Sequence, residues 1–117
     1  MNDLKDRTKQ FALDVMKFCS GLPLKPEYKS IRYQLIRCAT SVGANYRSAC
    51  RAKSKLDFIA KMAIVEEEAD ESLYWLELLE ALGVNEADLL RRLKDEAAQL
   101  TAIVVASKKT ARAGLAR

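Results

Sequence analysis

The residues with the clearest chemical potential are positively charged side chains in the first half of the chain. Residues 1–56 hold twelve lysines and arginines against four acids, which gives this segment a charge of +8. On a helix that continues through residue 55, Arg37, Arg51 and Lys55 lie within about 40° of one another, with Arg47 on the flank. Such a basic strip could contact a phosphate backbone with little sequence preference. The predicted nucleic-acid contacts are Arg37, Arg47, Arg51, Lys53 and Lys55.

The second half of the sequence carries the opposite charge and offers these bases another partner. Residues 57–96 contain twelve acids and four bases, a balance of −8, and residues 97–117 return to +4. At about 100° per residue, Glu66 falls on an otherwise apolar helix face, where a carboxylate is tolerated only when paired. The basic strip is therefore either a phosphate-binding surface or a solvated face that pairs with acids of the next helix. The residues predicted to form structural ion pairs are Arg37, Glu66, Glu68 and Glu71.

Residue types that the chain lacks exclude several kinds of chemistry. The sequence has no histidine, which removes Ser-His-Asp and Cys-His catalysis and metal sites built on imidazole. A di-metal centre of paired carboxylates is a weak alternative, since such sites usually need Glu-x-x-His pairs. Cys19, Cys38 and Cys50 are widely spaced and odd in number, which is typical of reduced thiols. We expect no enzyme activity, no metal and no cofactor.

The start of the chain and its hydropathy indicate the cytoplasm. The first residues, Met1 to Asp6, lack the apolar segment of a signal peptide. No stretch approaches the roughly 18 uncharged apolar residues that a membrane span requires. We therefore expect a cytoplasmic protein with no membrane contact.

Helical periodicity and its interruptions define the elements that must position these residues. Apolar residues recur at intervals of three, four and seven, and Pro23, Pro26 and Gly83 break the pattern. Ser54 followed by Asp57 resembles a capping box at a helix start. With 117 residues and no strand signal, the prediction is one all-α domain, an antiparallel up-down four-helix bundle. The predicted helices span residues 3–20, 27–52, 55–82 and 86–108, and a frayed basic tail follows over 109–117.

The third predicted helix is apolar on two opposite faces. The face that we assign to the bundle core carries Phe58, Met62, Ala69, Leu73 and Leu76. A second apolar set falls on nearly the opposite side, which in a monomer would face water. It includes the only tryptophan, and a helix buried on both sides needs a partner; the alternative is scattered surface apolar residues, which are common. The predicted homo-oligomer interface is Ile64, Trp75, Leu78 and Leu82.

Three runs of residues, taken in order, resemble a known family. They are Arg37-Cys-Ala-Thr-Ser-Val-Gly-Ala-Asn45-Tyr-Arg-Ser-Ala, Ser54-Lys-Leu-Asp57-Phe58 and Glu68-Ala-Asp-Glu71-Ser-Leu-Tyr74-Trp75-Leu76-Glu77-Leu-Leu. Together they resemble the four-helix bundle family of 23S rRNA intervening-sequence proteins, over a stretch from about Phe11 to Gly83. The junction after the second helix, Arg47-Ser-Ala-Cys and then Arg51-Ala-Lys53, is more basic than the Glu-Gly-type end of many members.

The resemblance has several implications for assembly and partners. The family also includes the accessory variability determinant of diversity-generating retroelements, a homopentameric barrel that binds a reverse transcriptase and nucleic acid through basic surfaces. A similar protein here would be a homopentamer or another ring-like homo-oligomer, with RNA or DNA and a reverse transcriptase or other protein as candidate partners. Two hypotheses remain open: an RNA-binding scaffold, and a purely protein-binding or structural oligomer.

Overall fold

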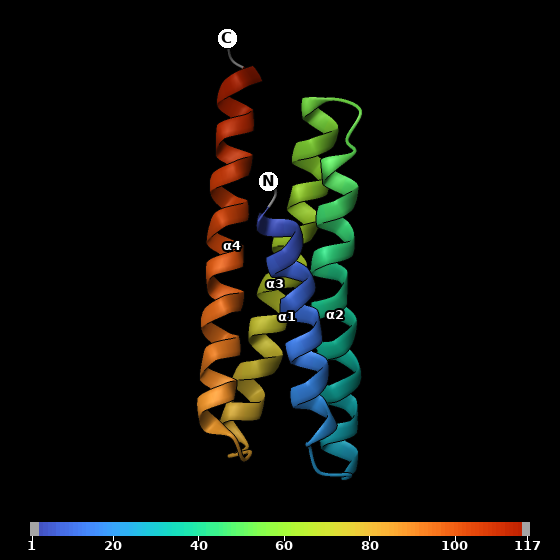
Figure 1. Ribbon diagram of the computed structural model, residues 1–117, viewed down its shortest axis with the longest axis vertical. Helices are drawn as coiled ribbons and strands as arrows, with labels where there is room; N and C mark the ends of the chain where they lie inside the picture. The colour runs from blue at the N-terminus through green and yellow to red at the C-terminus, as the bar shows by residue number, and fades with distance from the viewer. Residues whose placement is uncertain (1–2, 116–117) are drawn as a thin grey trace.

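Four α-helices joined by short turns account for most of residues 3–115, the part of the chain described by the computed structural model. Successive helices run antiparallel, so that α1 and α3 descend while α2 and α4 rise in Figure 1. The bundle measures 52 × 25 × 19 Å, and no strand occurs in the described residues. The predicted all-α four-helix bundle is confirmed. The helices are α1 (Asp3–Ser20), α2 (Pro26–Cys50), α3 (Lys55–Ala81) and α4 (Ala87–Leu115).

Local sequence signals mark the start of α2 and the start of α3. Pro26 occupies the first turn of α2, where a missing N–H costs nothing. The side chain of Ser54 accepts a 3.0 Å hydrogen bond from the backbone N–H of Asp57 and so begins α3. The Asp57 carboxylate accepts the Lys53 backbone N–H, also at 3.0 Å. α2 ends at Cys50, two residues before its predicted end at residue 52, and the backbone N–H of Arg51 donates to carbonyls of its last turn.

The predicted frayed tail over residues 109–117 is wrong as far as Leu115, because α4 continues to that residue. Residues 116 and 117 lie outside the described part of the chain. Lysine, arginine and alanine are good helix formers, and cations in the last turn interact favourably with the helix dipole. Half-buried Ser107, Ala111 and Gly114 keep the core-facing spacing over this stretch. Small side chains give a weak hydrophobic signal, so the apolar pattern missed them.

The buried positions alternate at spacings of three and four residues. In α3 they are Met62, Val65, Ala69, Ser72, Leu76 and Leu79. This heptad pattern is typical of helices that cross at about 20° and pack side chains into holes of the neighbour. Phe58 and Leu73, which were also predicted for the core, are only half-buried. A straight projection drifts by about 20° per heptad, which accounts for the displaced prediction.

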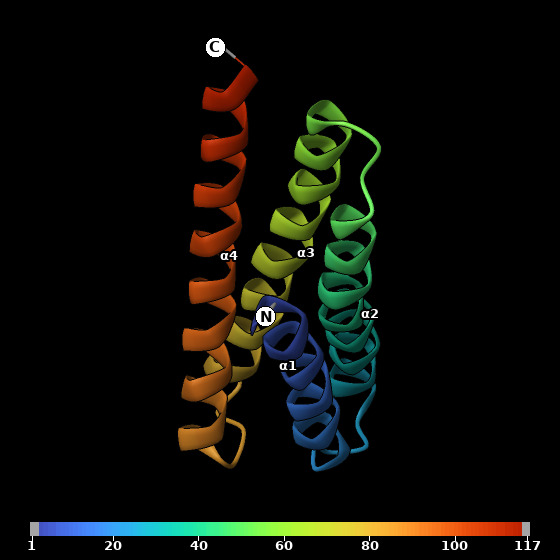
Figure 2. The ribbon, with the colours of Figure 1, turned by 45° about the horizontal axis from the view of Figure 1, so that its top comes forward.

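The first helix is shorter than the others and covers only part of the bundle. It packs mainly on α2 and has its least extensive contact with α4. In Figures 1 and 2, α4 and the α2–α3 turn extend beyond its N-terminal end. Near that end, Arg7 Nη2 lies 2.6 Å from Glu96 Oε1 of α4. At the other end, Arg32 Nε donates to the carbonyl of Cys19 at 3.1 Å. Two arginines thus fix both ends of α1.

Gly43 lies where α2 closely approaches α1. A Cβ atom at this position would lie 3.3 Å from Oγ1 and 3.5 Å from the carbonyl carbon of Thr8. Thr8 is buried, and its hydroxyl donates to the carbonyl of Lys5 at 3.2 Å. A glycine inside a helix costs about 1 kcal/mol relative to alanine. A glycine inside a helix predicts a close crossing with another helix. The close approach of α1 at this level explains why α2 has a glycine here.

Candidate nucleic-acid interface

The arginines in the first half of the chain fall into two groups. Arg7, Arg32 and Arg37 each bond to a carboxylate or to a backbone carbonyl. Arg47 and Arg51, one turn apart near the C-terminal end of α2, are exposed. Neither has an ion pair with any residue in 3–115. Within residues 3–115, this second group differs from the first in having guanidinium groups that bond to no carboxylate or carbonyl.

Arg47 and Arg51 line an open groove between α2 and α3, which we call the α2–α3 groove. It has a volume of about 440 Å³ and is lined by Ala44, Arg47, Ser48, Arg51 and Lys61. The Lys61 ammonium lies 2.7 Å from Oδ2 of Asp57. That ammonium, together with the backbone N–H of Lys53, lowers the pKa of Asp57. Sequence reasoning missed Lys61, although its position one turn after Asp57 was an available signal.

Arg37 lies outside this groove and is bonded to acids of α3. Its Nη1 lies 3.3 Å from Oε2 of Glu68, and its Nη2 lies 2.5 Å from Oε2 of Glu71. The same Glu71 oxygen accepts the indole N–H of Trp75 at 3.0 Å. The bond from Trp75, and then that from Arg37, lower the pKa of Glu71. Of the two roles predicted for Arg37, the structure shows the ion pair, and the Arg37 side chain remains 40% exposed.

Glu66 has a different partner from the predicted one. Its Oε1 lies 2.6 Å from Nζ of Lys108, on α4, rather than beside an arginine of α2. Because α3 packs against both α2 and α4, its acids divide between two neighbours. Glu68 and Glu71 reach α2, whereas Glu66 reaches the end of α4 that was predicted to fray.

The break between α2 and α3 disrupts the predicted basic strip. The strip required one helix through residue 55, whereas residues 51–54 form the turn. Lys53 is exposed in that turn. Lys55 begins α3 and points toward α4, where a Cβ atom on Gly114 would collide with its Nζ. A single strip from Arg37 to Lys55 is therefore wrong; Arg47 and Arg51 remain together.

The four residues predicted for an oligomer interface differ in exposure. Ile64 is 43% exposed and Leu82 is 46% exposed. Trp75 and Leu78 are half-buried against the core. The Trp75 ring also meets Tyr74 edge-on, with 5.0 Å between ring centroids. Part of the second apolar face of α3 is thus used within the protomer, and its exposed part lies at Ile64 and Leu82.

The buried thiols have little reactivity, and the described acids form no metal site. Burial raises the pKa of Cys19 to about 11, and burial also raises that of Cys38. Both thiols are therefore poor nucleophiles at neutral pH. Across residues 3–115, no group of three or more His, Cys, Asp or Glu side chains is placed to hold a metal ion. None of the helices described is long and apolar enough to cross a membrane.

Fold and groove together define a class, antiparallel helical bundles with a basic groove at one end. A family model for 23S rRNA-intervening sequence proteins matches residues 2–106, and the chain belongs to that family. A crystal structure from Bacteroides thetaiotaomicron, a protein of unknown function from the S23 ribosomal protein family, is similar with a TM-score of 0.83. The two are 29% identical over 91% of this chain and 98% of that one. Among curated proteins, none matches.

Proposed function

We propose that this protein is a non-enzymatic, cytoplasmic RNA-binding accessory protein whose ligand lies in the α2–α3 groove. The observation that carries this proposal is the exposed pair Arg47 and Arg51, which has no ion pair within residues 3–115. Exposed cations without internal partners raise the local concentration of polyanions. The family description, 23S rRNA-intervening sequence protein, is consistent with RNA as that polyanion.

Contacts from these side chains would go to phosphates rather than to base edges. Guanidinium groups pair well with phosphate oxygens, and such contacts position a nucleic acid without reading its sequence. Three acids of α3 pair with other bases: Glu68 and Glu71 bond to Arg37, and Asp57 bonds to Lys61. Binding would therefore be strongly salt-dependent and weakly selective.

Self-assembly is the second part of the proposal. Ile64 and Leu82 leave apolar surface on the outer side of α3. Contact between copies through this surface would bury it and repeat the basic groove around a ring, and the family resemblance supports a homopentamer. The competing function is a structural or protein-binding oligomer without nucleic acid. The ion pairs of Arg37 with α3 favour this structural alternative, because at Arg37 the opposite charges of α2 and α3 stabilise the fold.

The test compares two charge-reversed variants of α2. R47E/R51E changes the groove, and K25E/K29E makes the same change, at the same four-residue spacing, at the opposite end of α2. Both control residues are exposed. Fluorescence anisotropy of a structured RNA is measured over a salt series, on samples whose native mass has been checked by light scattering.

We expect the wild type to bind RNA with an affinity that falls linearly in log–log form as salt rises. R47E/R51E should weaken binding by at least about tenfold, whereas K25E/K29E should stay within about threefold of the wild type. Unchanged RNA binding by R47E/R51E at native mass would refute the RNA-binding proposal. A wild-type oligomer that binds no RNA at low salt would favour the structural alternative.

A further inference from the structure

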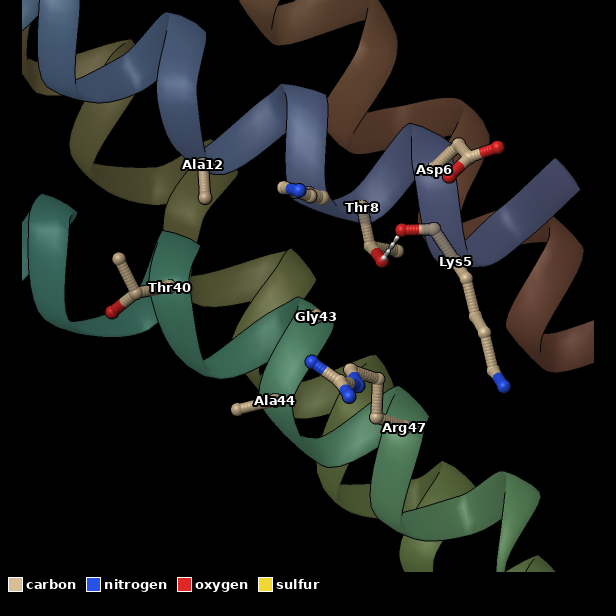
Figure 3. A pocket seen from close by; sticks show the side chains of 9 residues that line it. Lys5, Asp6, Thr8, Ala12, Thr40, Gly43, Ala44 and Arg47 are labelled. Carbon is tan, nitrogen blue, oxygen red and sulfur yellow. Dashed lines mark hydrogen bonds between the residues drawn. The ribbon is translucent and has the colours of Figure 1, made fainter.

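A second basic groove lies on the other side of α2, between α2 and α1. It has a volume of about 470 Å³, and we call it the α1–α2 groove. Small residues form part of its lining, among them Ala12, Gly43 and Ala44. In Figure 3, Lys5 extends away from α1 on the side of α2, and the side chain of Arg47 runs back along α2 in the direction of Gly43. Lys9 is the third cation of the lining.

The close crossing at Gly43 is what brings these cations together. Because a Cβ atom on Gly43 would already touch Thr8, the two backbones approach closely at this level. Lys5 and Lys9 lie one turn apart on α1 and flank Thr8. Arg47 lies one turn after Gly43 on α2. The helix contact therefore positions one pair of lysines opposite an arginine.

The charge of the α1–α2 groove is not balanced internally. Lys5, Lys9 and Arg47 are exposed and have no side-chain ion pair with any residue in 3–115. Asp6 is the one acid of the lining. Cations gathered in a groove with a single opposing carboxylate favour an anionic ligand.

The two grooves adjoin at Arg47. Ala44 and Arg47 belong to the lining of both the α1–α2 groove and the α2–α3 groove. From Gly43 to Arg51 the helix rises about 12 Å, at 1.5 Å per residue. A duplex carries about seven phosphate charges over such a length, counting both strands. Cations spread over such a length suit several phosphates better than one small anion.

The lining residues also distinguish between forms of nucleic acid. Proteins that bind single strands without sequence preference combine basic grooves with aromatic side chains on which bases stack. Neither groove has an aromatic residue in its described lining. The nearest exposed aromatic residue before them on α2 is Tyr33, about 15 Å along the helix from Gly43. Double helices, by contrast, are recognised through backbone and shape.

We infer that the α1–α2 groove is a second phosphate-binding surface, with Lys5 and Lys9 as additional contacts, and that its ligand is double-stranded RNA. This inference rests on the proposed function and extends it to α1. It also assigns Arg47 a central position, because this side chain serves both grooves.

The experiment measures binding of K5A/K9A to a fluorescent RNA duplex of about 20 base pairs. The two lysines that this variant removes would neutralise up to about two phosphates per protomer. K25A/K29A is the matched control, with the same charge removed at the same spacing. An unstructured single strand of about 40 nucleotides carries a similar number of phosphates. Circular dichroism verifies that both variants keep the wild-type helicity.

We expect K5A/K9A to bind the duplex at least about fivefold more weakly, with a salt slope smaller by about 2 in magnitude. K25A/K29A should stay within about twofold, and the duplex should bind more tightly than the single strand. If K5A/K9A matches its control while R47E/R51E loses binding, the α1–α2 groove has no role but the proposed function stands. If R47E/R51E binds normally, both fail. Equal or tighter binding of the single strand would overturn the choice of duplex.

Discussion

Arg37 and Arg47 lie on the same helix, ten residues apart, and meet different surroundings. Arg37 faces two acids of α3 and bonds to both. Arg47 faces two grooves lined mainly by cations and small residues. Arginine is therefore a structural residue in the middle of α2, at Arg37, and a candidate ligand-binding residue near its C-terminal end, at Arg47. What decides the role is the residue that the neighbouring helix presents at each level.

The two regions of α2 also differ in how far they are closed. Cys38, next to Arg37, is completely buried, and its Sγ lies 3.2 Å from the hydroxyl of Ser72. Cys50, next to Arg51, is exposed. Cys38 thus faces the core beside an arginine that is ion-paired, whereas Cys50 faces solvent beside an arginine that has no ion pair within residues 3–115. Each of the following predictions tests this difference.

The largest expected difference is in thiol alkylation. At pH 8, Cys50 should react with iodoacetamide at least about a hundredfold faster than Cys38, since a buried thiol reacts only when the structure opens. Burial also raises the pKa of Cys38, which lowers its thiolate fraction. Mass spectrometry of timed samples measures both rates. Duplex RNA should slow modification at Cys50 and leave Cys38 unchanged.

The control for alkylation is C50S, which should lose the fast reaction altogether. Similar rates at Cys38 and Cys50 would mean that the middle of α2 opens as readily as its end, and the contrast between the two regions would disappear.

A smaller difference is expected in thermal stability. R37E would place a third carboxylate beside Glu68 and Glu71, replacing attraction by repulsion, and should lower Tm by roughly 3–6 °C. R47E breaks no ion pair within residues 3–115 and should change Tm by less than about 2 °C. Calorimetry at low salt measures both. The exchanged pair R37E/E71R should recover part of the loss, and equal losses for R37E and R47E would show that the two arginines are structurally equivalent.

The sequence predicted the fold because helix pattern and helix ends are local properties. The apolar spacing identified four helices, and Ser54 with Asp57 marked the start of α3. The end of α4 was missed because Ala111 and Gly114 bury little apolar area, although they keep the heptad spacing. Where burial depends on small residues, helix extent depends on the neighbouring helix rather than on hydrophobicity.

The candidate site was less predictable because it depends on which helices face each other. Extending one helix through residue 55 grouped Arg37 with Lys55, whereas the turn at 51–54 sends Lys55 toward α4. The partner of Glu66, Lys108, comes from a region assigned to a frayed tail. Lys5 and Lys9 line the same groove as Arg47 because α1 and α2 cross at Gly43, and periodicity does not contain this relation between helices.

The smallest expected effect is a pH dependence carried by Glu71. Hydrogen bonds from Trp75 and Arg37 lower its pKa in the folded protein below the ordinary value of 4.5. As pH falls, the unfolded chain therefore takes up this proton first. The stabilisation from ionised Glu71 is complete well above pH 4.5 and is lost as pH falls through the lowered folded-state pKa.

W75F removes the indole donor at 3.0 Å, so its Tm should fall less steeply than that of the wild type below about pH 5, by roughly 1–2 °C over the titration. Y74F keeps that donor and serves as the control. R47Q should leave the dependence unchanged, because no carboxylate within residues 3–115 forms an ion pair with Arg47. If R47Q altered it as much as W75F, the C-terminal end of α2 would be coupled to acids in the way that its middle is.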